Sequence, residues 1–72
     1  MITLDQIRTK LNEYITQSNL TQLEIASRLG VKQPTIAQYL SGRAMPSLDT
    51  FANLCVLLKV DPADILCTRE AD

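Results

Sequence analysis

Hydrophobic residues recur along this 72-residue chain at spacings of three and four, the period of an amphipathic α-helix. The pattern predicts five helices, over about 4–18, 22–29, 33–41, 48–58 and 62–66. Residues that commonly cap helix N-termini precede four of them: Thr3, Thr21, Ser47 and Asp61. We therefore expect a compact all-α fold.

The segment 21–42 contains two short helices joined by a tight turn. Thr21 and Glu24 have the spacing of a capping box, as Thr3 has with Gln6, so the first helix of the segment begins directly after Thr21. Gly30 ends that helix, because glycine adopts the left-handed conformation at little steric cost. The second begins near Pro34, since proline fits the first turn of a helix.

The second helix of this pair presents a polar, almost uncharged face. At about 100° per residue, one arc of about 140° holds a mostly polar set: Gln33, Pro34, Ala37, Gln38 and Ser41. Ile36 and Tyr39 point the other way, and the small side chain of Ala26 lets the two helices cross closely. Glutamine can donate to and accept from adenine in the major groove, so this face suits base reading.

The flanking helices supply the rest of the core. Two apolar stripes are expected to face inward: Leu4, Ile7, Leu11, Tyr14 and Ile15 in one helix, and Leu48, Phe51, Leu54, Cys55 and Leu58 in the other. Asn19 is expected in the left-handed conformation, which would turn Leu20 back into the core. Residues 68–72 are expected to form a loose tail.

Several residues together resemble the lambda-repressor-like, Cro-type (XRE) helix-turn-helix family, from about Ile7 to Leu66. They are Leu20-Thr21-Gln22, Ala26, Leu29-Gly30-Val31, Gln33, Thr35-Ile36, Gly42 and Pro46-Ser47-Leu48. The resemblance implies a five-helix DNA-binding domain in which the second and third helices form the motif. The whole chain, 1–72, would be this one domain.

The resemblance also implies roles for particular residues. Gln22 would contact a phosphate and brace Gln33, while Lys32, Gln33 and Gln38 would contact bases or backbone. Arg43 would touch the sugar-phosphate backbone from the loop after the recognition helix. The candidate DNA-binding residues are Gln22, Lys32, Gln33, Thr35, Gln38, Ser41 and Arg43. The alternative for Gln22, Gln38 and Arg43 is an ordinary solvated position.

Some positions depart from the family pattern. Pro34 stands where some relatives have a second base-reading side chain, so fewer side chains would be available here for direct readout of bases. Ile15 replaces a common arginine, which removes an expected phosphate contact. Leu23 and Leu40 replace frequent glutamates and could belong to the core, a dimer surface or a partner site, of which we favour core or interface.

Charge does not mark the chain as a whole as a DNA-binding protein, because seven basic and eight acidic residues leave a net charge of −1. The distribution is more informative. Residues 21–43 carry three basic side chains against one acidic, whereas residues 44–72 carry two against five. This layout would orient the motif toward phosphate while keeping non-specific affinity low.

Composition excludes several other classes of protein. A hydrophobic content of 46% indicates a folded domain, and no apolar run approaches the ~20 residues of a membrane span. With no secretory signal either, we expect a cytoplasmic, bacterial or phage-encoded protein associated with the nucleoid. Histidine is absent and no phosphate-binding glycine motif occurs, so we expect no enzyme, no cofactor, no metal and no small-molecule substrate. Cys55 and Cys67 are expected to be free thiols, with Cys55 a small core residue.

The leading hypothesis is sequence-specific binding to duplex DNA by a homodimer on a palindromic operator, with the third helix in the major groove. Transcriptional repression follows from the family resemblance. The alternative is a protein-interaction module, such as an antitoxin or a regulator-binding protein, with secondary DNA contact. Leu23, Leu40, Ile15 and the acidic total favour that alternative.

Overall fold

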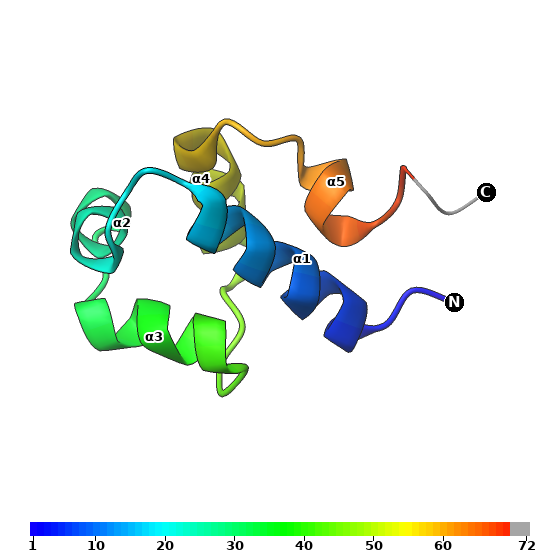
Figure 1. The fold of residues 1–72 in the computed structure, drawn as a ribbon, viewed down its shortest axis with the longest axis horizontal. Helices are drawn as coiled ribbons and strands as arrows, with labels where there is room; N and C mark the ends of the chain where they lie inside the picture. Colours follow the sequence, from blue (N-terminus) through cyan, green and yellow to red (C-terminus); the bar gives the residue numbers. More distant parts are fainter. Residues whose placement is uncertain (70–72) are drawn as a thin grey trace.

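The computed structural model describes residues 1–69 and contains five α-helices in that part of the chain (Figure 1). They are α1 (Leu4–Gln17), α2 (Gln22–Leu29), α3 (Gln33–Ser41), α4 (Leu48–Leu58) and α5 (Pro62–Leu66). No strand occurs among the described residues, so the predicted all-α fold is confirmed. The N-terminus and α5 lie on the same side of the molecule, and α2 and α3 lie away from them (Figure 1).

Both predicted capping boxes are formed. At α2, the Glu24 backbone N–H donates to the Thr21 hydroxyl at 3.1 Å, and the Thr21 N–H donates to the Glu24 carboxylate at 3.0 Å. Thr3 closes the start of α1 in the same way, and the Asp61 carboxylate accepts from the Ala63 N–H at α5. These bonds satisfy backbone donors that the first turn of a helix leaves free.

The core lies where α1, α2, α3 and α4 meet and extends to α5. α2 packs on α3 and α4, while α1 packs on α3 and α5. Nine buried residues form one cluster: Leu11, Ile15, Ile25, Ala26, Ile36, Tyr39, Leu54, Cys55 and Ile65. Ala26 is 1% exposed beside α3, as its small size at the crossing predicts.

Two residues of the predicted apolar stripes are not in the core. Leu4 is 69% exposed and Leu48 is 87% exposed, so the prediction was wrong for both. Each is the first residue of its helix. Because side chains tilt toward the helix N-terminus, a side chain at this position points off the end of the helix.

The turn after α1 also differs from the prediction. Asn19 does not have a positive φ; among the non-glycine residues described, Lys59 and Cys67 do. Ser18 closes α1 with an extended backbone, and both its N–H and its hydroxyl donate to the Ile15 carbonyl. This end of the helix therefore needs no left-handed residue, and Leu20 still packs against the core as predicted.

The last described residues contact the segment that contains α5. The Thr68 N–H donates to the Ala63 carbonyl at 3.1 Å, and Arg69 forms ion pairs with Asp61 at 2.5 Å and Asp64 at 3.0 Å. The loose tail expected over residues 68–72 stays a prediction, with these bonds joining residues 68–69 to the α5 segment. The rest of that prediction, residues 70–72, lies outside the described residues.

Candidate nucleic-acid interface

The turn between α2 and α3 depends on the backbone of one glycine. Gly30 has φ 74° and ψ 27°, and the next N–H, from Val31, donates to the Ala26 carbonyl at 3.0 Å. A Cβ at Gly30 would meet nothing within 4 Å, so the requirement for glycine comes from the positive φ alone. The left-handed turn predicted from the sequence is confirmed.

The start of α3 has no side-chain cap. Lys32 is its N-cap but makes no side-chain capping bond, and Pro34 occupies the first turn. Lys32 and Gln33 are both exposed. This end of the helix therefore keeps backbone donors that no capping side chain covers.

α3 separates buried from exposed side chains as its periodicity predicts. Ile36 is fully buried and Tyr39 is 6% exposed, which fixes the helix to the core. The outward arc is exposed along its whole length: Gln33, Pro34, Ala37, Gln38 and Ser41. In Figure 1, α3 forms one edge of the molecule, so an extended partner can approach this face.

Six of the seven candidate residues are exposed, and Thr35 is partly buried at the margin of the arc. Within residues 1–69, five of the exposed side chains form no hydrogen bond or ion pair: Gln22, Lys32, Gln33, Gln38 and Arg43. Ser41 is different, because its hydroxyl donates to the Gln38 carbonyl at 3.2 Å. No hydrogen bond joins Gln22 to Gln33 in the described chain, so the implied bracing contact is not formed here.

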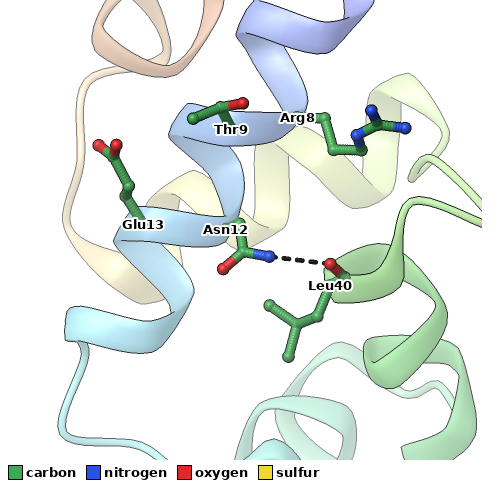
Figure 2. A pocket seen from close by; sticks show the side chains of 5 residues that line it. All are labelled: Arg8, Thr9, Asn12, Glu13 and Leu40. Atoms are coloured by element: carbon green, nitrogen blue, oxygen red, sulfur yellow. Dashed lines mark hydrogen bonds between the residues drawn. The ribbon is translucent and has the colours of Figure 1, made fainter.

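The far end of α3 is held by α1, which the sequence analysis missed. The Asn12 amide donates to the Leu40 carbonyl at 2.8 Å (Figure 2). This bond satisfies a carbonyl that the last turn of a helix leaves without a partner. The two residues are 28 positions apart, and no local pattern relates them.

A shallow hollow of about 230 Å³ lies beside this bond. It is lined by Arg8, Thr9, Asn12, Glu13 and Leu40 (Figure 2). Arg8 also reaches the residue that ends α3: a Cβ on Gly42 would lie 2.6 Å from the Arg8 Nη1. Gly42 has φ 81°, and this left-handed conformation is what favours glycine there, since the Arg8 guanidinium is the end of a flexible side chain that could move aside.

The three residues that departed from the family pattern have different environments. Ile15 is 3% exposed in the core cluster, so its side chain is not available to a DNA phosphate. Leu40 packs against the core, in agreement with the interpretation we favoured. Leu23 is 62% exposed on α2, so for this residue core packing was wrong.

Titratable groups add little chemistry to this face. The hydrogen bond from the Thr21 backbone lowers the pKa of Glu24, and the Ser47 hydroxyl, donating at 2.6 Å, lowers that of Asp49. Ser47 is the N-cap of α4 by position. Its hydroxyl bonds neighbouring side chains and makes no bond to the helix backbone, contrary to its expected capping role.

Both cysteines are free and buried, and burial raises the pKa of the Cys55 thiol. Cys55 lies in the core cluster, as predicted. Among residues 1–69, no three histidine, cysteine or acidic side chains gather as metal ligands would. Within the same residues, none of the helices has the length and apolar character needed to cross a bilayer.

Comparison with known proteins relates this geometry to sequences and structures of one kind. The sequence pattern of the helix-turn-helix family matches residues 11–65. An uncharacterized HTH-type transcriptional regulator from Archaeoglobus fulgidus is 40% identical over 66 residues, which cover 92% of this chain and 93% of the relative. The solution structure of the SOS-response transcriptional repressor LexA from Eubacterium rectale is similar with a TM-score of 0.76 and 30% identity, covering 92% of this chain and 73% of that one.

Proposed function

Because this chain belongs to the lambda-repressor-like helix-turn-helix family of DNA-binding transcription regulators, we propose that it reads a specific duplex sequence with α3. The observation that carries the proposal is the outer face of α3, where Gln33 and Gln38 are exposed and uncommitted to the fold. Amide side chains can pair with adenine edges in the major groove.

The remaining candidate residues would position the helix. Lys32, Gln22 and Arg43 lie at the two ends of α3 and at the start of α2, where phosphates flank a helix in the groove. Thr35 and Ser41 lie at the margin of the arc and at its far end, and would contact backbone or base edges there. Such contacts fix the register of the protein on DNA, while the glutamines discriminate sequence.

We further propose a homodimer of single-domain subunits, 1–72, on a palindromic operator. Two copies of α3 would then enter successive major grooves about 34 Å apart. The C-terminal half offers apolar surface for self-association, since Leu48 and Val56 on α4 are 87% and 77% exposed. Occupying the operator would block polymerase and repress transcription.

Fluorescence anisotropy against random duplexes and duplexes from the protein's own promoter, at two salt concentrations, tests this function. Gln33→Ala should lose about 1 to 3 kcal/mol on the preferred site and little on random duplex. Asn53→Ala, which removes an exposed amide from α4, is the matched control and should change neither. Equal losses on both duplexes would exclude base reading by Gln33.

Lys32 is tested by the same titration. If it contacts phosphate, Lys32→Ala should weaken binding to all sequences alike. It should also lower the salt slope, which is the steepness with which the logarithm of affinity falls with the logarithm of salt concentration, by about one per subunit. An unchanged slope would exclude this contact.

A second candidate function is binding of a regulatory protein, such as a toxin or an antirepressor. The exposed Leu23 on α2 favours it, because the described chain leaves most of this apolar residue uncovered. The two functions differ in the first measurement above. A protein-interaction module that has lost DNA contact would show no preferred duplex at either salt concentration.

A further inference from the structure

We propose that Arg8 of α1 binds a DNA phosphate together with Arg43, forming a phosphate site at the C-terminal end of α3. The inference rests on the proposed function and extends it to a helix outside the helix-turn-helix motif. No feature of the motif sequence identifies Arg8, because it lies 34 positions from Gly42 along the chain.

The position of the guanidinium carries the inference. A Cβ on Gly42 would lie 2.6 Å from Arg8 Nη1 and 2.8 Å from its Cδ, so the side chain lies directly on the glycine backbone. Gly42 separates Ser41 from Arg43, two of the residues proposed to meet DNA. Figure 2 shows Arg8 and Asn12 extending from α1 on the side where α3 ends. Arg8 therefore lies beside the backbone that joins Ser41 to Arg43, where the proposed function places DNA.

The local electrostatics also favour a cation here. α3 has no basic side chain in its last turn, so its carbonyl end lacks the positive charge that commonly balances the helix dipole. Arg8 supplies that charge from α1. Its side chain is still 42% exposed, so a phosphate can reach it from solvent.

Asp5 sets the orientation of Arg8 and competes with phosphate for it. The two side chains form an ion pair of 2.6 Å across one turn of α1, and the Asp5 side chain is 82% exposed. An exposed ion pair contributes little to stability, so exchanging the carboxylate for a phosphate is inexpensive. Removing the carboxylate should therefore strengthen DNA binding.

The main experiment compares Arg8→Gln with Lys10→Gln in the full chain. Both variants remove one positive charge from α1, but within residues 1–69 Lys10 pairs only with Glu13, at 3.9 Å. Arg8→Gln should weaken binding to preferred and random duplexes alike, by about tenfold or more, and lower the salt slope by about one per subunit. Lys10→Gln should stay within about twofold of wild type, because a charge without a phosphate contact adds only a screened, long-range attraction.

Two further variants separate phosphate binding from support of the fold. Arg8→Lys keeps the charge and should keep the salt slope, although it loses the guanidinium beside Gly42. Arg8→Met keeps an apolar stem of similar length. It should lower the salt slope as Arg8→Gln does, while unfolding at nearly the wild-type temperature.

A separate pair of variants tests the competition between Asp5 and phosphate. Asp5→Asn should tighten binding to every duplex more than Glu13→Gln does.

The outcomes are distinct. If wild type prefers a site but Arg8→Gln and Lys10→Gln lower the slope equally, or if Arg8→Met keeps the wild-type slope, Arg8 does not bind phosphate. If wild type binds no duplex, both the proposed function and this inference fail.

Discussion

The two helices of the motif are built in different ways. α2 is closed by its own residues: the Thr21 capping box at its start, Arg28 in its last turn, and Gly30 at its end. α3 has no side-chain cap and no charged residue in either terminal turn. Gly42 ends α3 in the left-handed conformation, as Gly30 ends α2, and the last turn of α3 is also held by Asn12, which reaches across from α1.

The difference indicates how the motif combines stability with an open surface. The two ends of α2 are specified locally, because every feature that starts and stops it lies within ten residues of sequence. α3 is positioned in part by a contact from α1, while its uncapped start and its outer face are left free for another molecule. The position of α3 should therefore be more sensitive than that of α2 to substitutions in distant parts of the chain.

The largest expected effect comes from breaking the inner face of α3. Ile36 is fully buried, so Ile36→Ala should reduce the free energy of unfolding by about 2 to 5 kcal/mol through lost burial and a cavity. Gln38→Ala, two positions on and exposed, should stay within about 0.5 kcal/mol. Urea denaturation followed by circular dichroism measures both. Similar losses would mean that α3 is not docked as described.

The next largest effect is expected from removing the hydrogen bond by which α1 holds α3. Asn12→Ala leaves the Leu40 carbonyl without its donor and should reduce the free energy of unfolding by about 1 to 3 kcal/mol. Glu13→Ala, on the same helix and beside the same hollow, should cost less than about 0.5 kcal/mol in the same urea titration. If the two variants were equally stable, the dependence of α3 on α1 would be wrong.

A smaller effect tests the local closure of α2. Thr21→Ala removes the capping bond at 3.1 Å and should cost about 1 kcal/mol. Ser47→Ala is the control at α4, where the hydroxyl bonds side chains but not the helix backbone, and should cost less than about 0.5 kcal/mol. Thermal unfolding distinguishes them, and a larger loss for Ser47→Ala would contradict the difference in capping.

The smallest effect is a dependence of stability on pH. The capping bond lowers the pKa of Glu24 in the folded protein, so its stabilisation is fully present above the unfolded value of about 4.3. It is lost as the pH falls through the native pKa. Glu24→Gln should therefore lose less stability than wild type on acidification, as measured by thermal melts across that range. If the stability of wild type and of Glu24→Gln fell equally with decreasing pH, the carboxylate would not contribute to the cap.

The helix ends show how much of the fold follows from the sequence. Thr3, Thr21 and Gly30 act as predicted, because capping and left-handed closure depend on residues within one helical turn. Periodicity likewise placed Ile36 and Tyr39 inward, and left Gln33 and Gln38 outward. The likeness to the family added the expected roles of these residues, which the DNA titrations above test.

Only the tertiary structure decided the features that depend on where neighbouring helices end. Periodicity gives the direction of a side chain but not the extent of its cover, so Leu4 and Leu48 were placed in the core and are exposed. The contacts of Asn12 with Leu40 and of Arg8 with Gly42 join α1 to α3 across some 30 residues. Such pairs are set by how helices pack, and no local spacing encodes them.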